Sequence, residues 1–192
     1  EPNGRVLEVH DLQDKSGFGV TGVAVNYSAD GGATFSATKQ FDYVQDTGPT
    51  DVRYGGLVAA TADPITGELY AAWSDSRYNV NGRDDVLVSR SRNGGSIWST
   101  ATRMDASGAS SQVDQLTPAI AAYDGSGYIT YLRRDETSST SAASARVVRM
   151  ASLNPESTFH RFAVLCPPST SAHPPHPSHH PSSFLVTYHG LP

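Results

Sequence analysis

The sequence predicts an all-β protein built from repeated antiparallel sheets, and three observations support this. Short stretches of apolar and β-branched residues alternate with turn-forming residues roughly every 8–12 positions. The 3.6-residue periodicity of an amphipathic helix is hard to find anywhere in the chain. Two different motifs also recur at one interval of about sixty residues, which is typical of a repeat architecture.

The expected strands are these apolar stretches, taken in order. The stretch at 20–27 is rich in valine and the one at 68–73 ends in Trp73, so both carry side chains that strands favour. Gly, Asn, Asp and Ser separate the stretches, and these residues form turns. Strands are expected at 5–9, 20–27, 56–61, 68–73, 85–89, 118–123, 128–132 and 146–150.

The first repeated motif is eight residues long. Ser28-Ala-Asp-Gly-Gly-Ala-Thr-Phe35 recurs as Ser91-Arg-Asn-Gly-Gly-Ser-Ile-Trp98, an offset of 63 residues (91 − 28). A degraded third copy, Ser152-Leu-Asn-Pro-Glu-Ser-Thr-Phe159, follows after 61 residues (152 − 91). Each copy comes directly after an expected strand, so the motif occupies the same place in each repeat.

A second motif keeps nearly the same interval. Its glycines are Gly4, Gly67 and Gly127, at offsets of 63 (67 − 4) and 60 (127 − 67) residues, and an expected strand follows each one. The second repeat then contains four strands, A at 56–62, B at 67–74, C at 85–91 and D at 97–103. The third repeat gives strands at 117–123, 127–133, 145–151 and about 158–164, and the first begins at strand B.

A repeated four-stranded antiparallel sheet is typical of a β-propeller blade. We therefore expect residues 1–160 to form part of a propeller, with about three blades at approximately 3–52, 53–113 and 114–165. Residues 166–192 differ, because they are rich in Pro, Ser and His and contain no Asp, Glu, Lys or Arg. We expect this tail to be disordered, since it has too little patterned apolar surface to offset its ordering entropy. A reading-frame change or truncated gene model and a genuine extension both remain possible origins for it.

The eight-residue motif has the chemistry of a tight hairpin turn. Its paired glycines adopt positive φ without a Cβ penalty, and Asp30 or Asn93 can accept hydrogen bonds from turn amides. Ser28 and Thr34 can add hydroxyl hydrogen bonds. The aromatic residue at the end of each copy can pack against a sheet.

These motifs resemble the Asp-box, or BNR repeat, of the sialidase superfamily, over about residues 3–160. The residues that carry the resemblance are Ser28, Asp30, Gly32, Thr34, Phe35, Ser91, Asn93, Gly95, Trp98, Ser152, Asn154 and Phe159. The resemblance implies a six-bladed propeller when complete, with the Asp-box in a structural role on the face away from the active site. The third copy departs most, because Pro155-Glu156 replaces the glycine pair.

If the box turns lie on one face, the loops at 10–19, 42–55, 74–85, 104–117 and 133–145 lie on the opposite one. Many charged residues fall in these loops, and we take as candidate substrate-face residues Arg53, Asp75, Arg77, Arg134 and Asp135. Arginine matches a substrate carboxylate bidentately, which is the chemistry that the resemblance implies for an acidic sugar. The alternative is that Asp75 and Arg77 form an ion pair that ends a strand.

The resemblance implies an exo-glycosidase that hydrolyses terminal acidic sugars of glycoconjugates, secreted or at the cell surface. Sialidases use three arginines, a Tyr–Glu nucleophile and an Asp acid/base, an exception to the usual carboxylate pair. None of these residues is assignable in this sequence, so the catalytic residues stay unknown. The alternative is a non-catalytic propeller that binds glycans or proteins. We expect the isolated chain to have little activity.

The composition excludes several other classes. A net charge of −5 and a pI near 5.7, with scattered arginines, argue against nucleic-acid binding. Cys166 is the single cysteine, which rules out an internal disulfide and a cysteine zinc site. No apolar run reaches the roughly 18 residues of a membrane span, and no signal-peptide pattern is visible. No metal or cofactor is expected, since the Gly17–Gly22 pattern precedes a strand and the His-rich tail is interrupted by prolines.

Overall fold

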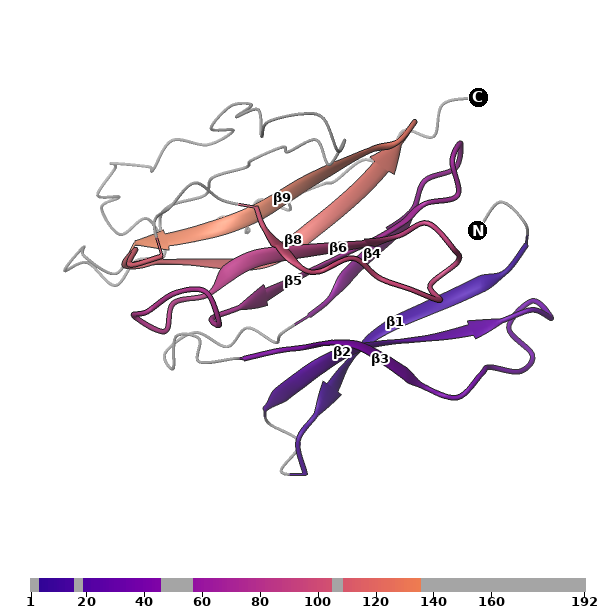
Figure 1. The fold of residues 1–192 in the computed structure, drawn as a ribbon, viewed down its shortest axis with the longest axis horizontal. Coiled ribbons are helices and arrows are strands. Elements are labelled where there is room, and N and C mark those ends of the chain that lie inside the picture. Colours follow the sequence, from indigo (N-terminus) through magenta and orange to yellow (C-terminus); the bar gives the residue numbers. More distant parts are fainter. Residues whose placement is uncertain (1–3, 16–18, 46–56, 105–108, 136–192) are drawn as a thin grey trace, which may run out of the picture.

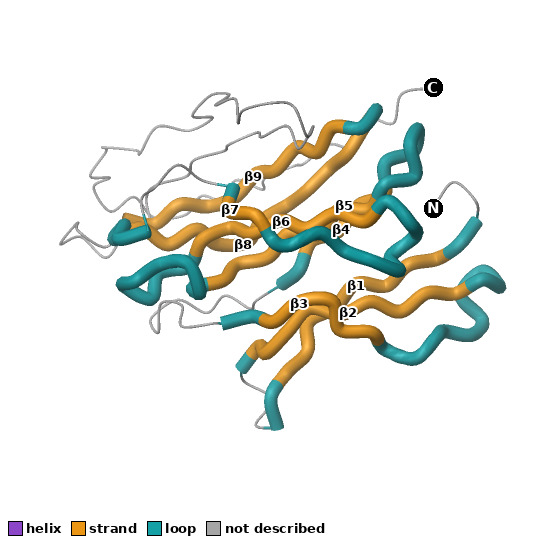
Figure 2. The backbone as a smooth tube through the Cα atoms, viewed as in Figure 1, coloured by secondary structure: helices purple, strands orange, loops and turns teal. Residues whose placement is uncertain are grey.

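The computed structural model describes residues 4–15, 19–45, 57–104 and 109–135, and this part of the chain is all-β (Figures 1 and 2). The strands are β1 (Val6–Gln13), β2 (Val20–Ser28), β3 (Lys39–Tyr43), β4 (Ala59–Ala62), β5 (Leu69–Asp75), β6 (Asp85–Ser91), β7 (Thr102–Arg103), β8 (Val113–Tyr123) and β9 (Ser126–Asp135). The described residues contain no helix that is long and apolar enough to cross a membrane.

The strands form three antiparallel sheets, one for each sequence repeat. The first sheet has the order β1-β2-β3, the second β4-β5-β6-β7 and the third β8-β9. The second repeat therefore forms the four-stranded sheet that its sequence predicts, and the described part of the first repeat contains β1, β2 and β3. The expected strands at 145–151 and 158–164 lie outside the described residues, as does the tail at 166–192.

Several elements differ from the prediction. β1 continues to Gln13 instead of ending at 9, and β3 is not among the expected strands. The strand expected at 97–103 is reduced to β7, and Trp98, which precedes it, donates its indole N–H to the Gly95 carbonyl at 3.1 Å. β8 begins four residues early, at Val113 instead of 117, and contains a bulge between Leu116 and Ala119. Thr117 adopts a φ of 49° at this bulge, directly before Pro118, which has no N–H for the ladder.

The second sheet is packed on both of its faces. Every residue of β5 is buried, and successive side chains of a strand point to opposite faces. Trp73 faces one cluster, together with Val23 of β2, while Ala72 faces another, together with Ile129 of β9. The second sheet therefore lies between the other two, and its two faces hold the core of the described protein (Figure 1).

A buried aspartate joins the second sheet to the third. Asp63 directly follows β4, and its Oδ1 accepts hydrogen bonds from the backbone N–H groups of Ile65 at 2.8 Å and Thr66 at 3.2 Å. Its Oδ2 accepts from the N–H of Gly125, in the β8–β9 turn, at 2.6 Å. Burial alone would raise the pKa of Asp63, but these amide donors outweigh it, and the pKa lies below its ordinary value.

We predict that Asp63→Asn destabilises the protein by about 2 kcal/mol, because the amide leaves a buried N–H without its acceptor. As the pH is lowered, the variant should also lose less of its unfolding free energy than the wild type does. Since the folded-state pKa of Asp63 is depressed, its contribution is present above pH about 4 and decreases as the pH falls below that value. Denaturant titrations between pH 3 and 7 test this, with the exposed Asp124→Asn as the control. Equal acid slopes for Asp63→Asn and the wild type would contradict the assignment.

Candidate functional site

The first box turn, residues 28–35, is held by its own side chains. The Ser28 hydroxyl donates to Oδ1 of Asp30 at 2.6 Å and accepts the N–H of Gly32 at 2.8 Å. The Asp30 carboxylate also accepts the backbone N–H of Thr34 at 2.9 Å and the Thr34 hydroxyl at 2.6 Å. These donors, with the Ser28 hydroxyl first among them, hold the pKa of Asp30 well below its usual range.

The second box turn, residues 91–98, repeats this pattern. The Ser91 hydroxyl donates to Oδ1 of Asn93 at 3.0 Å and accepts the Gly95 N–H at 3.0 Å, while Oδ1 of Asn93 accepts the N–H of Ile97 at 2.8 Å. All four glycines of the two turns have positive φ, between 65° and 97°. The exchange of Thr for Ile97 removes the hydroxyl donor of the first turn. The third copy, with Ser152, Asn154 and Phe159, lies outside the described residues.

The closing aromatic residues of the two turns differ in their surroundings. Trp98 stacks on Phe41 of β3, with ring centroids 4.2 Å apart and an interplanar angle of 12°, so it joins the second sheet to the first. Phe35 is 44% exposed. The expectation that each aromatic packs against a sheet therefore describes Trp98 well and Phe35 poorly. Within the described residues, the first sheet has a neighbouring sheet on only one side.

The strand register places the box turns and the charged rim at opposite ends of the second sheet. Ser91, which begins the second box turn, lies opposite Leu69, whereas Asp85 at the other end of β6 lies opposite Asp75. Both of these aspartates are fully buried. In the first sheet Ser28 likewise lies opposite Val6, at the end away from the β1–β2 connection. We call this end of the stacked sheets, which in the second sheet holds Asp75 and Asp85, the rim.

At the rim, Asp75 and Arg77 form an ion pair that also reaches the first sheet. Nη2 of Arg77 lies 2.7 Å from Oδ2 of Asp75, and Nη1 lies 2.8 Å from Oδ1 of Asp42. Arg77 also donates to the carbonyl of Tyr43, and its side chain is 22% exposed. Burial would lower the pKa of Arg77, but hydrogen bonds and attraction from Asp75 and Asp42 outweigh it and raise the pKa. This geometry is that of an ion pair ending a strand.

Two further rim arginines are paired with buried carboxylates. Nη1 of Arg83 lies 3.2 Å from Oδ2 of Asp114, and Oδ1 of Asp114 accepts the N–H of Asp84 at 3.0 Å. Arg103, on β7, lies 3.1 Å from Asp85. Sequence reasoning overlooked Asp42 and Arg103. Arg103 is the last residue of the strand expected at 97–103, and this position could have indicated that it lies at the rim.

The remaining candidates are placed only in part. Arg134 lies opposite Asp114 in the β8–β9 register and is partly exposed, so it belongs to the rim. Asp135 lies opposite Val113 at the end of the same strand pair. Arg53 lies outside the described residues. The register thus brings Asp75, Arg77 and Arg134 to one end of the stacked sheets, together with Arg83 and Arg103.

The chemistry available at the rim is recognition by charge. The described residues hold no group of three or more His, Cys, Asp or Glu side chains arranged to bind a metal ion. Arginine guanidinium groups and carboxylates could contact an anionic or polyhydroxylated ligand through charge-assisted hydrogen bonds. Three of these arginines already contact carboxylates of the protein itself, so such a ligand would have to share or displace those contacts.

Comparison with known proteins does not assign the chain to a family. No protein-family model matches the chain, and no curated protein matches it significantly.

We predict that Arg77→Ala lowers the free energy of unfolding by about 2 kcal/mol, because it leaves Asp75 buried without its cation. Breaking a fully buried pair costs about 3–5 kcal/mol, and the partial exposure of Arg77 reduces this. The control is Arg92→Ala, since Arg92 is 58% exposed where it pairs with Glu68 and should contribute at most about 0.5 kcal/mol. Urea denaturation measures both, and equal small effects would show that the Asp75–Arg77 pair is not structural.

We also predict that the double variant Asn93→Asp/Ile97→Thr raises stability by about 1 kcal/mol, by restoring the hydroxyl–carboxylate hydrogen bond of the first turn. Ile97 is 70% exposed, so its replacement removes little buried surface. A double-mutant cycle by denaturant titration should show the gain only when both changes are present. Additive single effects would mean that the second turn does not adopt the hydrogen bonding of the first.

Proposed function

We propose that this chain is part of a sialidase-like β-propeller, and that the rim face binds terminal acidic sugars of glycoconjugates, which the complete protein hydrolyses. One observation carries the proposal: two box turns with the same hydrogen bonds occupy the same end of consecutive, stacked antiparallel sheets. A radial series of such sheets is how a propeller is built. Ligands of propellers bind at the ends of the blades, and the rim is the end away from the box turns.

The rim suits an acidic sugar in its chemistry. A sugar carboxylate is planar and accepts two parallel N–H bonds from a guanidinium, whereas neutral sugars offer only hydroxyl groups. Arg77, Arg83 and Arg134 come from two consecutive sheets and share this end. Terminal acidic sugars are displayed outside cells, so the same proposal places the protein in a secreted or cell-surface location.

A second function is favoured by a specific observation. Arg77, Arg83 and Arg103 each lie within 3.2 Å of a fully buried carboxylate of the chain. An arginine held in this way positions loops more readily than it clamps a substrate. This favours a non-catalytic propeller that binds glycans without hydrolysing them.

The test measures glycan binding with this chain, and turnover with the complete protein of which we propose it is a part. A fluorogenic sialoside and its neutral galactoside counterpart are compared for hydrolysis, and sialylated against desialylated glycans for binding. We expect saturable binding that prefers the acidic sugar and is weakened about tenfold or more in Arg134→Ala. The matched control, Arg92→Ala, removes an arginine from the box-turn end and should leave binding unchanged.

The outcomes separate the two functions. Binding with turnover supports the glycosidase, and binding without turnover supports the non-catalytic propeller. Equal affinity for acidic and neutral glycans, or no binding by a folded preparation, would sink both. Loss of binding in Arg92→Ala but not in Arg134→Ala would place the ligand at the wrong face.

A further inference from the structure

The second box turn contains an asparagine followed by glycine, Asn93 and Gly94, with Asn93 at the position that Asp30 holds in the first turn. The side-chain amide of such an asparagine can react with the next backbone nitrogen, because glycine has no Cβ to hinder the approach. The described residues also contain Asn81 and Gly82, in the loop between β5 and β6. Asn81 and Asn93 are both exposed, so exposure does not distinguish them.

Asn81 is held in a way that opposes this reaction. Its side-chain Nδ2, which would have to leave, donates to the carbonyl of Ser110 at 2.8 Å. The N–H of Gly82, whose nitrogen would have to attack, donates to the carbonyl of Asn79 at 3.0 Å. Both hydrogen bonds must break before the nitrogen can reach the amide carbon, so the folded loop should protect Asn81.

Asn93 is held by its amide oxygen instead. The Ser91 hydroxyl donates to Oδ1 at 3.0 Å and the Ile97 N–H donates to it at 2.8 Å. Within the part of the chain that the structure describes, neither Nδ2 of Asn93 nor the N–H of Gly94 has a hydrogen-bond partner. The two donors draw electron density from Cγ and stabilise negative charge on its oxygen, so this carbon is the more open to attack.

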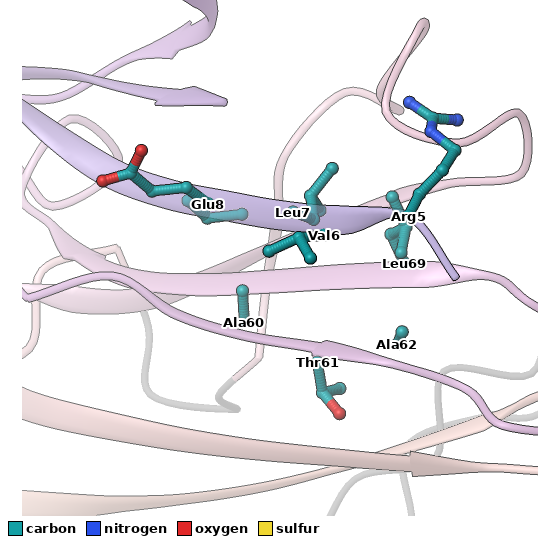
Figure 3. Close-up of a pocket in the computed structure, with 9 residues that line it drawn as sticks. Arg5, Val6, Leu7, Glu8, Ala60, Thr61, Ala62 and Leu69 are labelled. Carbon is teal, nitrogen blue, oxygen red and sulfur yellow. The ribbon is translucent and has the colours of Figure 1, made fainter. Parts of the chain in front are cut away.

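Two cations of the first sheet contact the same turn. Arg5, which directly precedes β1, extends away from the pocket between β1 and β4, and its Nη2 donates to the Gly94 carbonyl at 3.2 Å (Figure 3). Nζ of Lys39, at the start of β3, donates to the Ser96 carbonyl. The Gly94 nitrogen must lose its proton to attack, and nearby positive charge favours the resulting anion.

We propose that Asn93 is a site of spontaneous modification, at which water converts the asparagine into aspartate through a cyclic imide. The Gly94 nitrogen loses its proton to solvent and bonds to Cγ of Asn93, and Nδ2 leaves as ammonia with a proton from water. Water then adds to Cγ, the bond from Cγ to the Gly94 nitrogen breaks, and that nitrogen regains a proton. No oxidant or reductant is needed.

The turn also selects the product. Water that attacks the main-chain carbonyl carbon of the imide gives isoaspartate, whereas attack at Cγ gives aspartate. The donors at Oδ1 activate Cγ, and an aspartate at position 93 can keep both of them, as Asp30 does with the Ser28 hydroxyl and the Thr34 N–H. Isoaspartate would lengthen the main chain and break this spacing. The inference does not depend on the proposed glycan function, because the box turns lie away from the rim.

The test follows the whole chain over time in mildly alkaline buffer, by mass spectrometry of tryptic peptides. Residues 93–103 and 78–83 fall in separate peptides, which report Asn93 and Asn81 independently. In the folded chain we expect Asn93 to react at least about tenfold faster than Asn81. In the chain unfolded in guanidinium chloride the two rates should be similar, since both asparagines precede glycine. Circular dichroism before and after incubation confirms that the first sample stays folded.

The product is tested by the proportion of aspartate to isoaspartate at position 93. We expect this proportion to be at least about threefold higher in the folded chain than in the unfolded one. Ser91→Ala removes a donor to Oδ1, so its proportion should fall toward the unfolded value. The matched control is Ser96→Ala, because Ser96 is exposed in the same turn and its contact with Lys39 uses the backbone carbonyl. This control should change neither rate nor product.

The comparison of folded and unfolded wild-type chain decides the proposal without the variants. Equal rates at Asn81 and Asn93 in the folded chain would overturn it. So would an Asn93 that reacts more slowly in the folded chain than in the unfolded one, since the turn would then protect the amide. The same proportion of isoaspartate in both states would show that the turn does not select the product, and an effect of Ser96→Ala equal to that of Ser91→Ala would remove the role of the Oδ1 donors.

Discussion

The side chain of Trp73 connects the core of this protein to its charged rim, and much of the described structure depends on it. Trp73 is fully buried between the first two sheets and meets Phe41 edge-on, with ring centroids 6.1 Å apart. Its indole N–H donates to Oδ2 of Asp75 at 3.2 Å, the atom that also binds Arg77. A buried aromatic ring thus fixes the carboxylate that orders the rim.

This arrangement ties the second sheet to its neighbours at both ends. At the rim, Arg77 joins Asp75 to Asp42 of the first sheet. At the box-turn end, Asp63 joins the β4–β5 turn to Gly125 of the third sheet. Both connections use a buried carboxylate with several donors, which is the condition under which burying a charge is tolerable. The sheets are consequently held in register by polar contacts as well as by their apolar faces.

The contrast between the two ends also bears on function. The box turns satisfy their own hydrogen bonds locally and leave little for a ligand. The rim gathers arginines and carboxylates from several segments, with Arg77, Arg83 and Arg103 held in fixed positions by buried acids. A rim of this kind is pre-organised, which reduces the entropy lost when a ligand binds.

The sequence by itself determined the all-β class, the position of most strands and the form of the two box turns. It could do so because the turn contacts span two to four residues, as between Ser28 and Asp30 or Asp30 and Thr34. It missed β3, the end of β1 and the starts of β7 and β8, and the start of β8 is followed by a bulge at Thr117–Pro118.

Only the tertiary structure decided which charges meet. Arg77 and Asp42 are 35 residues apart, and Asp63 and Gly125 are 62 apart. Such contacts depend on how whole sheets stack, and no local pattern of residues predicts pairs that are so far apart in the sequence. Short-range hydrogen bonds can be deduced from spacing, whereas partners across a sheet interface are selected by the packing that buries them.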